Sequence, residues 1–267
     1  MATKFIKYEK ALLTIADTDI FAESAELAID ATLTPISNIT GSVIRYAPDS
    51  PVKGTLSFSH YCTGNFHDFL NPLTAIEHTG EPFEGSLGPF NFTQGYVKSL
   101  NFSVAPYSPI LFRSSMDIYG ELSINDTDAE YENKNLRHQT GMAHSMRSYI
   151  VGTDVGINNK VSFDYAVSCE RNPVIFIGDE NPSRVTKENV RINLSIAGED
   201  IGSSITITGN YAALEIQVLE AYGNNTPMGK FGCTGQIFGQ NLSISEGGYA
   251  DGTISVSQEY LTGRAFY

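Results

Sequence analysis

Two stretches in the second half of the chain decide the fold: KVSFDYAVS at Lys160–Ser168 and NVRINLSI at Asn189–Ile196. In each stretch nearly every second residue is apolar, and β-branched and aromatic residues are common. Successive side chains of a β-strand point to opposite faces, so this alternation predicts strands with one face in a core and one face outside.

The same alternation recurs along most of the chain, between short stretches rich in Gly, Pro, Asn and Asp. Six further stretches show it: Ala25–Pro35, Gly54–Tyr61, Tyr96–Val104, Ser204–Gly209, Ala213–Ala221 and Gly252–Tyr260. Helical signal is sparse, and only Asn65–Leu70 and Ala129–Met146 offer a weak one. The sequence therefore predicts an all-β fold built from short antiparallel strands.

One stretch interrupts the pattern. Asn125–Ser145 carries charges of both signs and contains few large apolar residues, which is typical of a linker or an extended loop. It separates residues 1–124 from residues 146–267. We therefore expect two tandem β-sandwich or β-barrel-like domains, joined by a linker at 125–145.

Both halves also follow a similar order of segments. Each begins with an extended apolar segment, ALLTIADTDIF or SYIVGTDVGI, followed by an alternating strand that ends at Pro35 or Pro173. Each closes with a segment that we interpret as a long hairpin, Phe90–Pro106 in the first half and Gln240–Tyr260 in the second. This order predicts an internal duplication of one β unit.

Composition limits the function. The chain has 267 residues with 17 Lys+Arg and 30 Asp+Glu, a net charge of −13. Such a charge disfavours tight binding of nucleic acid, which depends on Lys and Arg contacts to phosphates. Only 18% of the residues are charged, below the quarter or so that is typical of globular domains. We therefore expect a surface that is largely uncharged and polar, or buried against partners.

Targeting and redox signals are few. No apolar run is long enough to cross a membrane, and the opening residues contain no signal-peptide core, so we expect synthesis in the cytoplasm and no membrane insertion. The three cysteines, Cys62, Cys169 and Cys233, are odd in number and widely spaced. This pattern predicts free thiols rather than a disulfide framework.

The search for catalytic chemistry is negative. His60, Cys62 and His67 lie close together but lack a fourth ligand at zinc spacing, and no CxxC, HExxH or GxSxG motif is present. Three carboxylate pairs are candidates for glycosidase or calcium chemistry but are typical of loops: Asp17/Asp19, Asp179/Glu180 and Glu199/Asp200. We therefore predict no catalytic, cofactor-binding or metal-binding residues, no cofactor, and a protein that is not an enzyme.

The second half contains a distinctive series of motifs: RNPVIFIG at 171–178, NPSRV at 181–185 and NVRINLSI at 189–196. This series resembles the tail-tube-type structural proteins of tailed bacteriophages. The matching residues are Arg171, Pro173, Val174, Ile175, Ile177, Gly178, Pro182, Val185, Ile192 and Leu194. The end of the chain also resembles that family's last strands. In the first half only Pro35 and Lys53–Phe58 match.

The resemblance implies a structural virion protein of the tail tube, neck or baseplate. It would self-associate through β-edges into homo-oligomeric rings, trimers or hexamers, contact neighbouring tail proteins, and surround an acidic lumen through which DNA passes without tight binding. We expect Thr253–Tyr260, Gly178–Thr186 and Leu12–Phe21 to contribute to interfaces. Two alternatives remain open: a β-sandwich binding module, such as an adhesin, a lectin or a capsid decoration protein, and an all-β glycoside hydrolase.

Overall fold

The computed structural model describes residues 12–20, 22–48, 52–61, 82–105, 108, 110–124, 146–147, 160–199, 211–219, 227–244 and 250–261. Every regular element within these ranges is a strand, so the all-β prediction is confirmed. This part of the chain holds no helix long and apolar enough to cross a membrane. The strands are β1 (Leu13–Ile15), β2 (Thr18–Ile20), β3 (Ala22–Asp30), β4 (Leu33–Ser37), β5 (Val43–Pro48), β6 (Lys53–Tyr61), β7 (Phe83–Leu87), β8 (Phe90–Val104), β9 (Leu111–Ile118), β10 (Leu122–Ile124), β11 (Met146–Arg147), β12 (Lys160–Val174), β13 (Arg184–Glu199), β14 (Tyr211–Leu219), β15 (Pro227–Ile244) and β16 (Ala250–Leu261).

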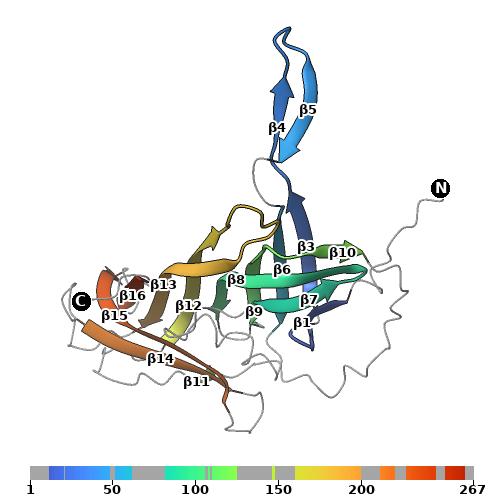
Figure 1. The fold of residues 1–267 in the computed structure, drawn as a ribbon. Coiled ribbons are helices and arrows are strands. Elements are labelled where there is room, and N and C mark those ends of the chain that lie inside the picture. The colour runs from blue at the N-terminus through green and yellow to red at the C-terminus, as the bar shows by residue number, and fades with distance from the viewer. Residues whose placement is uncertain are drawn as a thin grey trace.

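A 14-stranded antiparallel sheet contains most of these strands (Figure 1). Its long path runs in the order β3-β6-β9-β8-β12-β13-β16-β15-β14-β11. Strands β7, β1 and β2 continue from the first half of β8, and β10 pairs with the start of β8. Strands β4 and β5 form a separate two-stranded sheet that rises from the body.

The alternation in the sequence determines which face of each strand is buried. In β12, Phe163, Tyr165, Val167 and Cys169 are buried, whereas the residues between them are not. Strand β15 curls over this face, and the Phe231 ring lies 4.6 Å from Phe102 and 5.4 Å from Tyr165 between centroids. The two ends of the sheet therefore enclose one hydrophobic core in a sandwich-like arrangement.

The two halves share one strand order. Numbered along the sequence, five strands of the first half are β3, β6, β7, β8 and β9, and their order in the sheet is β3-β6-β9-β8-β7. Five strands of the second half are β12 to β16, and their order is β12-β13-β16-β15-β14. In both halves the order is first, second, fifth, fourth, third. Each fourth strand pairs with the third strand along its first part and with the fifth strand along its second part.

The irregularities of the two fourth strands coincide as well. In β8 the register with β9 shifts at Lys98, and in β15 the register with β16 shifts at Phe238, 140 positions later. The pairs just before each bulge keep the same spacing, namely Val97 with Met116 and Ile237 with Val256. Because bulges are specific features of a strand pair, their coincidence indicates equivalent positions in two copies of one unit.

The division into separate domains at 125–145 stays a prediction, because these residues lie outside the described ranges. Strand β8 of the first half pairs with β12 of the second half from Ser99 to Val104. A single cluster of buried apolar residues draws on both halves, from Leu13 to Val256. The two halves are thus joined side by side in one sheet.

One sequence-based prediction is wrong. Phe90–Pro106 does not fold into a hairpin, because 90–104 form the single strand β8; Gly95 lies where that strand passes from β7 to β9. Within the expected interface segment Thr253–Tyr260, residues 253–257 pair with both β13 and β15, whereas residues 258–260 pair with β13 alone. A contribution of this segment to an interface stays a prediction.

Candidate assembly surfaces

The junction between β8 and β12 shows how one unit of this fold binds the next. Tyr165 pairs with Phe102 and Val167 pairs with Leu100, with these side chains buried on the core face. On the opposite face the Ser103 hydroxyl donates a hydrogen bond of 2.5 Å to the Asp164 carboxylate. The junction therefore combines an apolar side with a polar side.

Several strands, among them β2, β10 and β11, pair on one edge only within the described residues, and two such edges belong to a first strand and a fourth strand of the repeated order. Strand β3 pairs with β6 on one edge only, and β15 beyond Gln236 pairs with β16 on one edge only. Both edges carry exposed apolar side chains: Ile29 is 48% exposed, Leu242 45% and Ile244 72%. Unpaired edges of this kind invite pairing with another chain.

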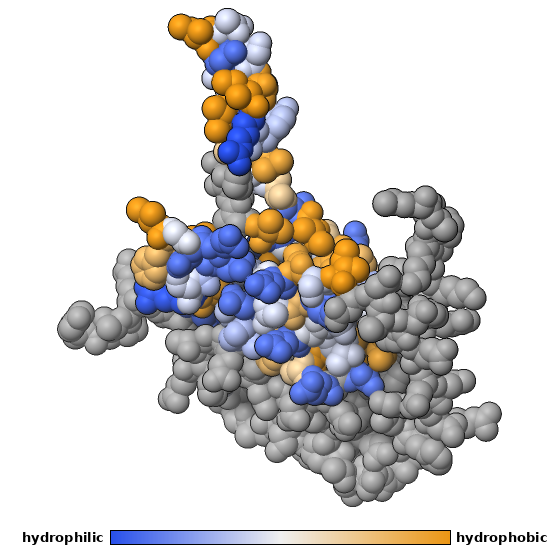
Figure 2. All heavy atoms as spheres, turned by 45° about the vertical axis from the view of Figure 1, so that its right-hand side comes forward, coloured by the Kyte–Doolittle hydropathy of each residue, from blue (hydrophilic) through white to orange (hydrophobic). Residues whose placement is uncertain are grey.

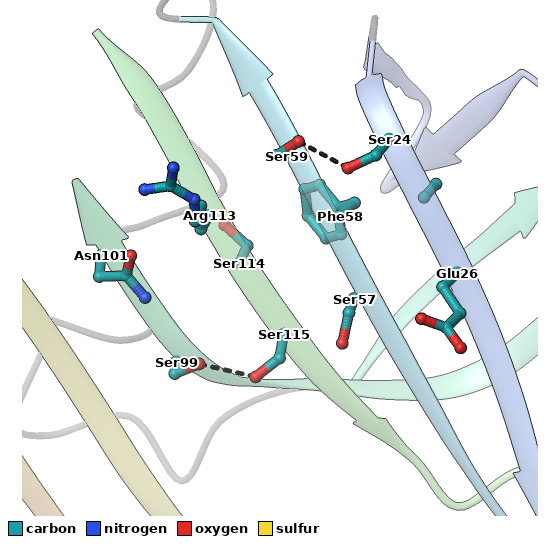
Figure 3. Close-up of a pocket in the computed structure, with 11 residues that line it drawn as sticks. Ser24, Glu26, Ser57, Phe58, Ser59, Ser99, Asn101, Arg113, Ser114 and Ser115 are labelled. Atoms are coloured by element: carbon teal, nitrogen blue, oxygen red, sulfur yellow. Dashed lines mark hydrogen bonds between the residues drawn. The ribbon is translucent and has the colours of Figure 1, made fainter.

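The face of the sheet opposite the core is lined by small polar side chains that hydrogen-bond between strands. Figure 3 shows Ser24 against Ser59 and Ser99 against Ser115, each pair 2.7 Å apart between hydroxyl oxygens. The pattern continues in the second half with Ser195 against Ser255 at 3.0 Å. Over β3, β6, β9 and β8 this face forms an open groove of about 560 Å³, whose other polar groups include Asn101, Arg113 and Glu26.

Charges of both signs lie on this polar face. The carboxylates include Glu26, Asp117, Asp164 and Glu259, and the cations include Lys53, Lys98, Arg113 and Arg191. The ammonium groups of Lys53 and Lys98 lie 3.3 and 3.5 Å from the Asp117 carboxylate. Arg191 is paired with Glu259 at 2.9 Å, and this contact lowers the pKa of the Glu259 carboxyl. Basic groups that are paired with carboxylates in this way offer less attraction to phosphate groups.

Strands β4 and β5, with the turn between them, form an arm that stands away from the body (Figure 1). Apolar side chains are exposed along it (Figure 2), among them Leu33, Ile36, Ile39, Ile44 and Tyr46. A two-stranded hairpin is marginally stable by itself in water. We infer that the arm is built to contact another surface.

The second half has a short connection in the place of the arm. It joins β12 to β13, and it exposes Ile175, Phe176 and Ile177. Strands β3 and β12 are separated by four successive antiparallel pairings, so they run parallel. The arm and this connection therefore leave the same end of the sheet, as Figure 1 shows.

Of the closely spaced residues His60, Cys62 and His67, which we do not predict to bind a metal, only His60 lies in the described ranges. His60 is buried, and its ring stacks between Phe58 and Phe112 at centroid distances of 5.7 and 5.5 Å. Burial lowers the pKa of His60 to about 4. Cys62 and His67 lie outside the described ranges. Within those ranges, no group of three or more His, Cys, Asp or Glu side chains could hold a metal ion.

Two of the three carboxylate pairs lie in separate turns. Asp17 and Asp19 belong to the β1–β2 hairpin, where Asp19 accepts a hydrogen bond from the Thr14 hydroxyl. Asp179 and Glu180 lie in the β12–β13 connection. Asp200 of the third pair lies outside the described ranges. The prediction that the protein is not an enzyme stays a prediction.

Two of the cysteines are buried core residues. Cys169 and Cys233 are free thiols, as the odd count predicts. Burial raises the pKa of both thiols, that of Cys233 to about 12. A thiol that stays protonated is a poor nucleophile, so both cysteines fit the structural role expected from the sequence.

A partly buried polar cluster beside the middle of β8 was not anticipated. The Arg171 guanidinium lies 5.3 Å from the Tyr96 ring centroid and donates a hydrogen bond of 3.0 Å to the carbonyl of Val97. The Asp117 carboxylate lies 3.3 Å from the Lys53 ammonium. Arg171 thereby fixes the end of β12 onto β8. The basic residue of the phage-like motif has a structural role here, for which its sequence position gave no signal.

Comparison with known proteins identifies no relative. No protein-family model matches the chain, and no curated protein matches its sequence. The fold and its surfaces define an all-β protein with a repeated strand order, two unpaired edges and an apolar arm. The functional argument below therefore rests on these features.

Proposed function

We propose that this protein is a non-enzymatic structural subunit that self-associates into rings, as a tail tube, neck or baseplate ring protein of a tailed-phage virion. The observation that carries the proposal is the repeated strand order. The two edges that are joined in the β8–β12 junction recur on β15 and β3, where they have no partner in the part of the chain that the structure describes. Because these two free edges differ from each other, they support a head-to-tail contact, and head-to-tail contacts close into rings when the rotation allows.

The side-by-side junction bears on the stoichiometry. Two β units of one chain already lie next to each other in one sheet, rather than in separate sheets. A ring that repeats this junction with sixfold geometry contains three chains. The arrangement favours a trimer with pseudo-sixfold symmetry over a hexamer with stacked layers.

The polar face supports a conducting lumen. Serine and asparagine side chains line it, and its basic groups Lys53, Lys98 and Arg191 each lie within 3.5 Å of a carboxylate. DNA passing such a surface meets basic groups that are already paired with carboxylates, so tight binding of its phosphates is disfavoured. This property fits a tube whose cargo must move.

The arm supports stacking of rings. It leaves the same end of the sheet as the apolar Ile175–Ile177 segment, so a ring would expose apolar side chains from both halves on one rim. Exposed apolar surface on a rim marks a contact site. We infer that this rim contacts the next ring or a neighbouring tail protein.

The test is the state of the purified chain in light scattering and negative-stain microscopy. We expect annular particles of about 87 kDa, three times the chain mass of 29.1 kDa. A charge on the β3 edge, Ile29→Asp, should dissociate them. The matched control, Ile124→Asp, alters an exposed isoleucine of β10, away from β3, β15 and the apolar rim, and should leave the rings intact. A wild-type chain that stays monomeric up to high concentration would contradict the proposal.

A second candidate, a β-sandwich binding module, is favoured by the open groove over β3, β6, β9 and β8. Its hydroxyl, amide, guanidinium and carboxylate groups could bind a polar ligand such as a carbohydrate. A compact monomer whose melting temperature rises with an added saccharide would support this candidate. Loss of that rise in Arg113→Ala, with Arg184→Ala as an exposed control, would assign the binding to the groove.

A further inference from the structure

We propose that the edge of β15 from Gly239 to Ile244, which has no partner among the described residues, pairs with residues 25–30 of β3 in a second copy of the chain, antiparallel and in the register of the β8–β12 junction. This inference rests on the proposed ring assembly and specifies its contact. It identifies the partner as another copy, and it fixes which residue lies opposite which.

The register follows from the positions of equivalent residues in the two halves. On the fourth strands, the coincident bulges make each residue of β15 equivalent to the residue of β8 that lies 140 positions earlier. By this relation Gly239–Ile244 correspond to Ser99–Val104. That stretch of β8 is the one that pairs with β12.

The first strands are aligned through their neighbours. Met116 and Val256 are equivalent by the bulge alignment, and they pair with Leu56 and Leu194 respectively. Those two leucines pair in turn with Leu27 and Tyr165. Leu27 of β3 is thus equivalent to Tyr165 of β12, 138 positions later. The same spacing separates Pro35 from Pro173, the prolines at which the sequence patterns of the two halves agree.

Transferring the junction to the free edges gives explicit pairs. Tyr165 pairs with Phe102 in the junction, so Leu27 lies opposite Leu242 of the next copy. Likewise Ala25 lies opposite Ile244, and Ile29 lies opposite Gln240. The apolar side chains that are 45–72% exposed on the edges, Leu242, Ile244 and Ile29, correspond to junction residues that are at most 2% exposed. Pairing in this register would cover them.

The polar face gives an independent match. In the junction the Ser103 hydroxyl bonds the Asp164 carboxylate, and the same register sets Ser243 opposite Glu26. The next pair on this face is Asn101 with Ala166 in the junction, and the transferred pair is Asn241 with Ala28. A serine again faces an acid, and an asparagine again faces an alanine. The edge strands thus carry residue types suited to each other at the polar positions as well as at the apolar ones.

Site-specific disulfide formation tests the register in the full chain. A variant with Glu26→Cys and Ser243→Cys places two thiols directly opposite each other across the contact. Directly opposed residues of antiparallel strands have Cα atoms about 4.5–5.5 Å apart, within the range of a disulfide. We expect mild oxidation to convert most of the protein to interchain-linked species on non-reducing gels, and mass spectrometry of the digest to identify the 26–243 link.

The matched control is Ala28→Cys with Ser243→Cys, which keeps both thiols on the same face but displaces one by two residues. Such diagonal positions lie about 7–8 Å apart, so cross-linking should fall at least tenfold. The single-cysteine variants measure any reaction with the native thiols.

Each outcome decides something different. Preferential linkage of the displaced pair, a link within one chain, or rings without any linkage would overturn the register while leaving ring assembly as the function. A chain that is monomeric with and without the substitutions would overturn the proposed function as well.

Discussion

The β8–β12 junction and the two free edges contain equivalent positions of one repeated unit in two different environments. Phe102 and Tyr165 are 1% exposed inside the junction, whereas the equivalent Leu242 on β15 is 45% exposed. The alternating pattern is the same in both places. An alternating strand therefore encodes a surface that must be covered, and whether its own chain or a second copy covers it depends on its position in the sheet.

The largest expected effect separates these two environments. Phe102→Ala removes a side chain that contacts Phe112, Tyr165 and Phe231, so it should lower the free energy of unfolding by about 3–5 kcal/mol. Leu242→Ala should change the unfolding free energy of the monomer by less than about 1 kcal/mol but weaken association. Urea denaturation at low concentration and sedimentation velocity measure the two effects. Equal losses of monomer stability in both variants would contradict the claim that Phe102 is covered within the chain and Leu242 is not.

The next effect concerns a titratable group in the first half only. His60 lies on the core face of β6, with a folded pKa of about 4 against an ordinary value near 6.5. Between these values the unfolded chain binds more protons, so stability is highest above pH 6.5 and falls by about 3 kcal/mol towards pH 4. His60→Phe should remove most of this slope in denaturation curves measured across that range. An unchanged slope would show that other groups cause the acid sensitivity.

Gly95 of β8 and Gly235 of β15 occupy equivalent positions of the two fourth strands, but their surroundings differ. A Cβ on Gly235 would lie 2.0 Å from the backbone oxygen of Ser257, whereas a Cβ on Gly95 would meet side-chain atoms of Phe92 and Met116 at 2.8 and 3.0 Å. Side chains can move where a paired backbone cannot. Gly235→Ala should therefore destabilise the fold by about 3 kcal/mol and Gly95→Ala by about 1 kcal/mol. Thermal denaturation would contradict this reasoning if the order of the two were reversed.

The smallest effect on stability is expected for the arm. Replacing Leu33–Pro48 with a short Gly-Asn-Gly turn removes residues that are almost all exposed, so the free energy of unfolding should change by less than about 0.5 kcal/mol. Rings should still form, but their stacking should be lost. Electron microscopy distinguishes single rings from tubes. If tubes form without the arm, the arm does not contribute to the stacking contact between rings.

The sequence predicted the fold class because alternation is a local property of each strand. The alternation in KVSFDYAVS corresponds to the alternating buried and exposed side chains of β12, and Cys169 and Cys233 are free thiols in the core. Edge exposure was not predictable, because Leu242 and Phe102 follow the same alternation and only the sheet order distinguishes them. Gly95 was interpreted as a turn residue, although its lack of a side chain serves a crowded crossing between strands.

The most direct test of the central claim is a cryo-electron microscopy structure of the assembled particle at a resolution that separates strands. The account predicts a closed ring in which β15 of each chain pairs with β3 of the next, with Ser243 opposite Glu26 and Leu242 opposite Leu27. A ring whose chains meet through other strands, or through β3 and β15 in a different register, would contradict it.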